Sequence, residues 1–144
     1  MIHFVPLEQR HWLHIPKEAR PRYCEDTRGI VAEDTQGNVQ AVCILDTWTE
    51  NACQIHIYIK NPFVLKHGFQ QEVFNFVFGS GRELIVGVTP SDNHKALKFI
   101  RHMGFEDVTV IPDGYSKGVD FVITQLRKEN CAWIAKPSLQ AVGG

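Results

Sequence analysis

The sequence lacks long apolar runs and carries almost no surplus of charge. No window approaches the about 20 apolar residues that a membrane span needs, and the N-terminus shows no charged segment followed by an apolar one. The formal net charge is −1, from 15 Lys and Arg against 16 Asp and Glu. Nucleic acids and anionic membranes bind clustered Lys and Arg, so we expect neither as a partner.

Cysteine is scarce, and its spacing matches no disulfide, zinc or redox motif. The absence of a C-x-x-C pair favours a reduced, cytoplasmic chain. His11 and His14 are three positions apart, but no cluster of further histidines or carboxylates accompanies them. We interpret both as surface or cleft-lining residues and expect no metal. The four cysteines are Cys24, Cys43, Cys53 and Cys131.

The composition is otherwise that of a globular protein, with 44% hydrophobic and 22% charged residues among 144. A chain of this length is expected to fold as one domain. We assign the domain to residues 1–128 and a C-terminal tail to residues 129–144. The segment 131–134 (Cys-Ala-Trp-Ile) is amphiphilic and is expected to dock on the body, whereas residues 138–144 are expected to be mobile.

The most informative stretch is residues 84–105. Aliphatic residues at 84–88 predict a strand covered on both faces, and the polar side chains at 89–92 can cap a helix. Ala96, Phe99, Ile100 and Met103 then recur at helical spacing, and Gly104 is suited to end the helix in a left-handed conformation. The polar turn lies at the carboxyl end of the strand, where open α/β sheets bind ligands.

The remaining chain predicts several strands and one more helix. Short strands are indicated at 2–5, 30–32, 39–45, 53–60, 108–111 and 119–126, with a loop at 112–118 and an aromatic-rich helix at 70–78. In the segment 53–60 the isoleucines alternate with polar residues, which is typical of a half-buried strand. We predict an α/β (α+β) fold with a mixed, mostly antiparallel sheet of about six to seven strands and about four flanking helices.

One segment resembles a known family. Asn93-x-x-Ala96 followed by Gly104-Phe105 is similar to the N-x-x-A-x-x-L-Y-x-x-x-G-F segment of the GNAT superfamily of N-acetyltransferases. The order of the predicted elements resembles that fold over roughly residues 1–128. The resemblance implies a GNAT-like fold in which the fourth strand splays from the fifth, and acetyl-coenzyme A as cosubstrate, with its pantetheine arm between the two strands.

The resemblance also implies which residues contact the cosubstrate. The family's phosphate cradle, Q/R-x-x-G-x-G/A, aligns with Leu65-x-x-Gly68-x-Gln70, so only the central glycine is kept. The alternative is that Asn61-Pro62 starts a helix early and leaves no cradle. The residues implied to contact acetyl-coenzyme A are Ile57, Tyr58 and Ile59 on the fourth strand, Lys66, His67 and Gly68 in the cradle, and Asn93, Ala96 and Phe99 on the helix.

Two residues on the polar face of the fourth strand are candidate bases. His56 can accept a proton near neutral pH, and Tyr58 is the second candidate. The alternative is that both belong to the half-solvated face of a strand. The family's tyrosine, often the acid that protonates the leaving thiolate, aligns with Ile100, which cannot donate a proton.

Two functions therefore follow. The first is transfer of an acetyl group from acetyl-coenzyme A to a primary amine by direct attack in a ternary complex. The second is a catalytically inactive GNAT-like protein that serves as a binding or virion-structural component. The small size, altered cradle and L-R-x-x-x-C-x-W-I ending resemble short GNAT-like proteins of tailed phages and prophages. That second resemblance would add virion proteins as partners and the virion as a location. The sequence leaves the oligomeric state open, a homodimer included.

Overall fold

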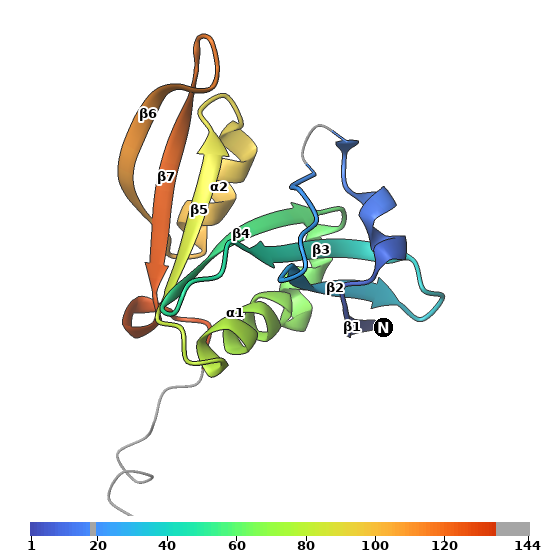
Figure 1. Cartoon of the computed structure of the whole chain (residues 1–144). Coiled ribbons are helices and arrows are strands. Elements are labelled where there is room, and N and C mark those ends of the chain that lie inside the picture. Colours follow the sequence, from blue (N-terminus) through green and yellow to red (C-terminus); the bar gives the residue numbers. More distant parts are fainter. Residues whose placement is uncertain (18–19, 135–144) are drawn as a thin grey trace, which may run out of the picture.

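The structure, a computed structural model, describes residues 1–17 and 20–134. They form one seven-stranded sheet in the order β1-β2-β3-β4-β5-β7-β6 (Figure 1). All neighbouring strands are antiparallel except β4 and β5, which are parallel. The predicted mixed, mostly antiparallel sheet is confirmed. The strands are β1 Ile2–Pro6, β2 Arg28–Asp34, β3 Val39–Asp46, β4 Ala52–Ile59, β5 Leu84–Pro90, β6 Glu106–Ser116 and β7 Val119–Arg127.

Two α-helices flank this sheet in the described part of the chain, and three short 3-10 helices accompany them. They are α1 Phe69–Gly79, α2 His94–His102, η1 Gln9–His14, η3 Pro62–His67 and η4 Lys128–Asn130. None of the helices in the described ranges has the length and apolar character needed to cross a bilayer. Helix α1 packs on β1–β4 and helix α2 on β5, so each part of the sheet has its own helix (Figure 1).

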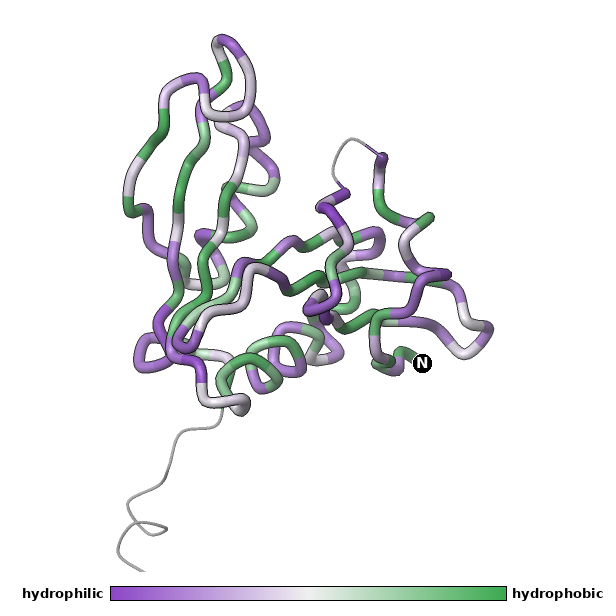
Figure 2. The backbone as a smooth tube through the Cα atoms, viewed as in Figure 1, coloured by the Kyte–Doolittle hydropathy of each residue, from purple (hydrophilic) through white to green (hydrophobic). Residues whose placement is uncertain are grey.

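The aromatic helix α1 is buried against the sheet, as its composition indicates. Phe69 and Phe74 are almost fully buried and pack in one cluster with Cys43, Leu45 and Ile85 of the central strands. Figure 2 shows apolar positions running along these strands and along α1. A second cluster lies on the other face, where η1 and the segment that follows it cover β2 and β3. Its members include Ile15, Val31, Val42 and Ile44.

The predicted loop at 112–118 is wrong, because β6 continues to Ser116. The register of β6 with β7 shifts between Ile111 and Ser116, so this part is an irregular strand. Asp113 has a φ of 56°, and its carboxylate accepts a hydrogen bond of 2.7 Å from the Gly118 amide. Proline, aspartate and glycine disfavour strands, but pairing with β7 overrides that local preference.

The segment after β7 returns to the body of the protein. Cys131 is fully buried in the main cluster, and the indole nitrogen of Trp133 donates a 2.8 Å hydrogen bond to the Met103 carbonyl oxygen. The segment 131–134 thus lies on the body, as its pattern indicates. Residues 138–144, for which the sequence predicts mobility, lie outside the described residues. The boundary at residue 128 stays a prediction.

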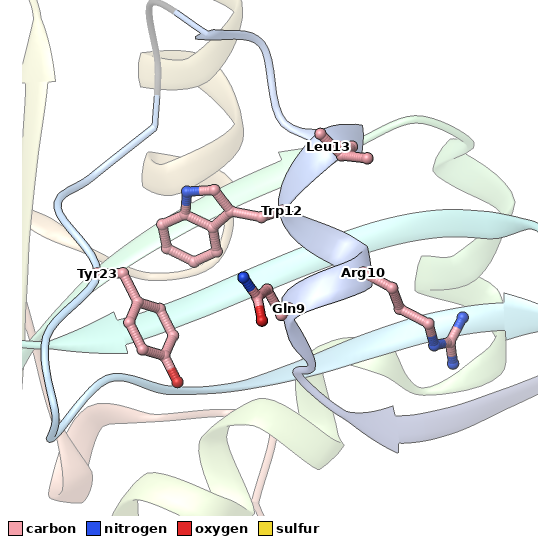
Figure 3. Close-up of a pocket in the computed structure, with 5 residues that line it drawn as sticks. All are labelled: Gln9, Arg10, Trp12, Leu13 and Tyr23. Carbon is pink, nitrogen blue, oxygen red and sulfur yellow. The ribbon is translucent and has the colours of Figure 1, made fainter.

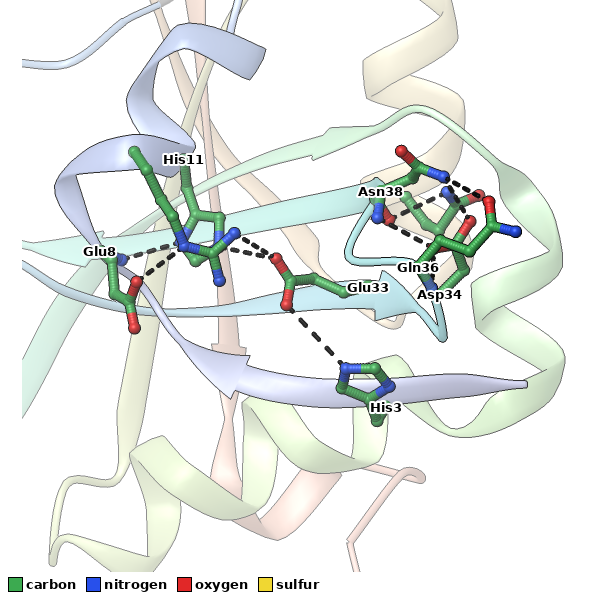
Figure 4. Close-up of polar contacts among 9 residues, drawn as sticks. His3, Glu8, His11, Glu33, Asp34, Gln36 and Asn38 are labelled. Carbon is green, nitrogen blue, oxygen red and sulfur yellow. Dashed lines mark hydrogen bonds and ion pairs between the residues drawn. The ribbon is translucent and has the colours of Figure 1, made fainter.

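A buried carboxylate fixes η1 to the sheet (Figure 4). The Glu33 side chain on β2 is only 5% exposed, and its oxygens lie 2.7 Å from Arg10 Nη1 and 3.1 Å from His11 Nε2. His11 Nδ1 accepts a 2.9 Å hydrogen bond from the Glu8 amide. The hydrogen bond from Arg10 lowers the pKa of Glu33 despite the burial of the carboxylate.

The interpretation of His11 as a surface or cleft-lining residue is therefore wrong, whereas His14 is exposed. His11 is completely buried because Glu33, 22 positions later, supplies a polar partner. The two residues meet because η1, which follows β1, lies over β2 and β3. No local spacing in the sequence reveals that contact.

We predict that Glu33→Gln lowers stability in a pH-dependent way. A carboxyl whose folded-state pKa is lowered stabilises the fold above its unfolded pKa of about 4.3, and that stabilisation is lost as the pH falls through the folded-state pKa. The urea midpoint of Glu33→Gln should be below that of wild type at about pH 7 and approach it in acid. Glu50→Gln, at an exposed turn position, should match wild type throughout. An equal gap at both pH values would contradict the assignment.

Candidate functional site

The parallel strands β4 and β5 stay together for only part of their length. Their pairing runs from Ala52 opposite Leu84 to Ile55 opposite Gly87 and then stops. Beyond that point β4 continues beside β3 to Ile59, and β5 continues beside β7 to Pro90. Figure 1 shows the two strands diverging toward their carboxyl ends. The predicted splaying of these strands is confirmed.

A cavity of about 450 Å³ lies where the strands separate. Its wall comes from β4, from η3 and from the start of α2. Six of the nine residues assigned to the cosubstrate by resemblance lie on this wall, namely Ile57, Tyr58, Ile59, Asn93, Ala96 and Phe99. The fold thus brings together two segments that are more than thirty positions apart in the sequence. Their contact with a cosubstrate stays a prediction.

The other three assigned residues, Lys66, His67 and Gly68, do not line this cavity. Lys66 and His67 are exposed at the end of η3, where the His67 ring lies 5.3 Å from the ring of Phe63. Gly68, with a φ of 86°, separates η3 from α1, and its amide donates to the Val64 carbonyl oxygen. Their role in phosphate binding stays a prediction.

The segment before α1 starts a helix early, as the alternative supposes, but that helix does not run through Gly68. The Asn61 side chain accepts a 3.1 Å hydrogen bond from the Phe63 amide, and Pro62 occupies the first turn of η3. The backbone there is a 3-10 helix with internal hydrogen bonds. The early helix ends at Gly68, and α1 begins afresh at Phe69.

Two lysines on the cavity wall were not predicted from the sequence to belong to the site. Lys60 follows the last residue of β4, and Lys95 is the second residue of α2. Pro62 and Leu65 of η3 were missed as well. The sequence does contain a signal for these two lysines, because Lys60 and Lys95 each adjoin a residue already assigned to the site. Their charge makes this opening suitable for an anionic group.

A second, smaller cavity of about 230 Å³ lies against the other face of β4. It shares Ile57, Tyr58 and Asn93 with the first cavity, so the two meet at β4. Its wall also contains His56, the predicted base. The remaining lining residues are Ile15, Pro16, Pro21, Val42 and Ile44.

A carboxylate orients the imidazole of His56. Its Nε2 atom lies 3.0 Å and 3.1 Å from the two oxygens of Asp46, and the side chains are 26% and 11% exposed. A carboxylate only accepts hydrogen bonds, so Nε2 carries the proton and Nδ1 is left with a lone pair. Thr47 Oγ1 donates a further 3.2 Å hydrogen bond to Asp46. The arrangement can accept a proton at Nδ1.

Asp46 was not predicted from the sequence to belong to the site. It is the last residue of β3, ten positions before His56, and the register of β3 with β4 brings it beside the imidazole. An acidic residue just before a hairpin turn is common and indicates nothing by itself. The contact becomes visible only once the strand register is known.

The position of the family's tyrosine holds a buried apolar side chain. Ile100 packs in the main cluster, and its Cδ1 would lie 3.3 Å from a Cβ added at Gly87. Gly87 thereby allows α2 to approach β5 closely at the last paired position. No proton donor stands at this position, as expected.

A third cavity, of about 660 Å³, lies apart from the separated strands (Figure 3). It lies between η1 and the segment before β2 and is lined by Gln9, Arg10, Trp12, Leu13 and Tyr23. It is larger, and Leu13 on its wall is 78% exposed. It contains neither His56 nor any residue of β4. We therefore place the candidate site at the two cavities that meet on β4.

Comparison with solved structures identifies the fold. The chain is similar to spermidine/spermine N-acetyltransferase SpeG from Vibrio cholerae, with 14% identity, a TM-score of 0.71 and coverage of 89% of this chain and 93% of that one. A protein of the GNAT family from Desulfovibrio desulfuricans, assigned as an acetyltransferase, has 14% identity, a TM-score of 0.70 and coverage of 89% and 99%. One assigned as a phosphinothricin N-acetyltransferase has 18% identity, a TM-score of 0.69 and coverage of 88% and 98%.

No protein-family model matches the sequence, and no curated protein matches it either. The structural likeness at these identities establishes the fold alone, and that fold is the GNAT fold. The GNAT-like architecture implied by the Asn93 to Phe105 segment is confirmed. The further resemblance to phage and prophage proteins stays a prediction.

We predict that Asn93→Ala lowers the free energy of unfolding by about 1 kcal/mol, because Asn93 caps α2. Its side-chain oxygen accepts a 3.2 Å hydrogen bond from the Ala96 amide. Asn93→Asp keeps an acceptor there and should remain close to wild type. Urea denaturation measures both variants. Equal losses in the two variants would show that the cap is not what Asn93 contributes.

Proposed function

We propose that this protein is an N-acetyltransferase that moves an acetyl group from acetyl-coenzyme A to a primary amine in a ternary complex. The observation that carries the proposal is the early end of the β4–β5 pairing, beyond which β4, η3 and α2 line a cavity. A base with an oriented lone pair lies on the other face of the same strand.

The cavity suits the cosubstrate in shape and charge. Its position between β4 and α2 suits a pantetheine arm lying along the free edge of β4, and Ala96 leaves room on the helix side. The edge of β4 beyond Ile55 has no partner in β5, so its backbone groups there are free to bind an amide-containing arm. Lys60 and Lys95 would attract the phosphates at one end.

The chemistry follows from the two cavities. A protonated amine entering from the smaller cavity transfers a proton to His56 Nδ1, and the freed lone pair attacks the thioester carbon. The nitrogen–carbon bond forms and the carbon–sulfur bond breaks, so that coenzyme A leaves as a thiolate and the nitrogen releases its second proton to solvent as the amide forms. Solvent supplies the proton that the thiolate takes up, because the side chain of Ile100 cannot donate one. Asp46 positions the imidazole and stabilises its charged form.

The alternative of an inactive binding or virion-structural protein is not favoured. The solved structures described above carry acetyltransferase names. The His56–Asp46 pair also retains a chemistry that a scaffold would not require. The cytoplasmic location, the homodimer and Tyr58 as a second base remain parts of the proposal.

We predict that acetyl-coenzyme A stabilises the protein. A ligand that binds only the folded state stabilises it by about 2.7 kcal/mol at about 100 times its Kd, which thermal denaturation detects. Ala96→Phe should abolish the shift by filling the cavity, whereas Lys98→Phe, on the exposed side of the same helix, should retain it. Failure of wild type to respond to millimolar cosubstrate would remove the transferase proposal.

We predict that His56→Ala reduces thiol release by about 100-fold to 10,000-fold while the cosubstrate-induced thermal shift is kept. Asp46→Asn should also reduce turnover, because a neutral amide stabilises the imidazolium less and its NH2 group can donate to Nε2, which favours the other tautomer. His14→Ala, at an exposed position, provides the matched control. Turnover of His56→Ala at the wild-type rate would exclude His56 as the base.

A further inference from the structure

We infer that the acceptor is a small primary monoamine with an uncharged, apolar body. This inference rests on the proposed function and specifies the substrate class of the same site. It comes from the smaller cavity, in which the amine must lie to reach His56. The wall of that cavity restricts the charge, polarity and size of what it accepts.

The wall is apolar over most of its extent. Ile15, Val42 and Ile44 belong to the second hydrophobic cluster and are at most 3% exposed, so they are held by packing from behind. Pro16 and Pro21 supply the remaining apolar contacts, each with a fixed φ. The side chains of this wall give the acceptor amine apolar contacts and no hydrogen bonds.

The polar side chains of the cavity gather on the side next to the cosubstrate cavity. They are His56, Tyr58 and Asn93, and the last two line both cavities. This polarity places the reacting amine at β4 and the rest of the acceptor against the apolar wall. An amphiphilic monoamine has the same arrangement of one polar end and one apolar body.

No described lining residue offers a counter-charge for a second charged group. None of them is a carboxylate, and both oxygens of the nearby Asp46 lie within 3.1 Å of His56 Nε2. None is a Lys or Arg, and the Nε of Arg20 donates to the Ile15 carbonyl oxygen. A second ammonium or a carboxylate on the acceptor would lose its hydration without a partner.

The cavity is also small. Its volume of about 230 Å³ is below the range of about 300–1,000 Å³ that accommodates drug-sized ligands. One ring or a short branched chain fills such a volume, whereas a long polyamine or a peptide would extend out of its open side. Because the described wall offers no counter-charge, it disfavours the further ammonium groups of an acceptor such as spermidine, the substrate in the name of one similar structure.

The first test compares acceptors on the full-length protein. Thiol release with saturating acetyl-coenzyme A is measured for benzylamine, isopentylamine, spermidine and glycine. We expect kcat/KM for the two apolar monoamines to exceed that for spermidine and glycine by about 10-fold or more. Equal or faster turnover of spermidine or glycine would overturn the inference. So would binding of the cosubstrate without turnover of either apolar monoamine.

The second test changes the wall. Pro21→Glu places a carboxylate at a half-buried position and should raise kcat/KM for 1,4-diaminobutane relative to benzylamine by about 10-fold. Pro112→Glu, on exposed β6, should leave that ratio unchanged. Ile44→Phe should lower benzylamine turnover while the thermal shift with acetyl-coenzyme A is retained. An unchanged ratio in Pro21→Glu, or undiminished benzylamine turnover in Ile44→Phe, would count against this cavity as the acceptor site.

The two proposals fail in different ways. Absence of a thermal shift with acetyl-coenzyme A, together with absence of turnover for every amine, removes the proposed function and the inference with it. A normal thermal shift with turnover of charged acceptors overturns the inference alone and leaves the transferase intact.

Discussion

The candidate site depends on the short parallel pairing of β4 with β5. Each strand has another neighbour that it follows further, since β4 pairs with β3 as far as Ile59 and β5 pairs with β7 as far as Pro90. The ladder between β4 and β5 ends at Ile55 and Gly87, and beyond it the free edge of β4 faces η3 and α2 instead of β5. The cavity lined by β4, η3 and α2 therefore needs no separate domain or lid.

The same strand then serves two cavities. Because side chains alternate along β4, Ile57 faces the main core while His56 and Tyr58 face the second cluster. The register of β3 with β4 also places Asp46 beside His56. The proposed base, its orienting carboxylate and the apolar wall thus arise from ordinary sheet geometry. The wall is rigid because it is the outer surface of a packed core.

The fold was largely predictable because its signals are local. The alternation of isoleucines in β4, the left-handed Gly104 and the apolar face of α2 each lie within a few residues. Residues of the candidate site were predictable only in segments that the family resemblance includes, such as Asn93 and Ala96. The helix start was placed too early, at 89–92, because β5 pairs with β7 up to Pro90 and Asn93 caps the helix.

What the sequence could not reveal are contacts set by strand register and by helix packing. Asp46 meets His56 across a hairpin, and Glu33 meets His11 where η1 packs on β2. Neither spacing is periodic, so neither pair stands out along the chain. Leu97, on the buried side of α2, was also missed because its neighbours on both sides are polar or small. Tertiary packing, not local propensity, decides these positions.

The irregular half of β6 has a consequence for the solubility of the protein. An edge strand eleven residues long, with Val108, Val110 and Ile111 about half exposed, would ordinarily be a template on which another chain could add a strand. Pro112 lacks an amide hydrogen, and the left-handed Asp113 turns the backbone out of the regular pleat. A straight incoming strand would therefore find a continuous row of donors and acceptors only as far as Ile111, which protects this edge against uncontrolled aggregation.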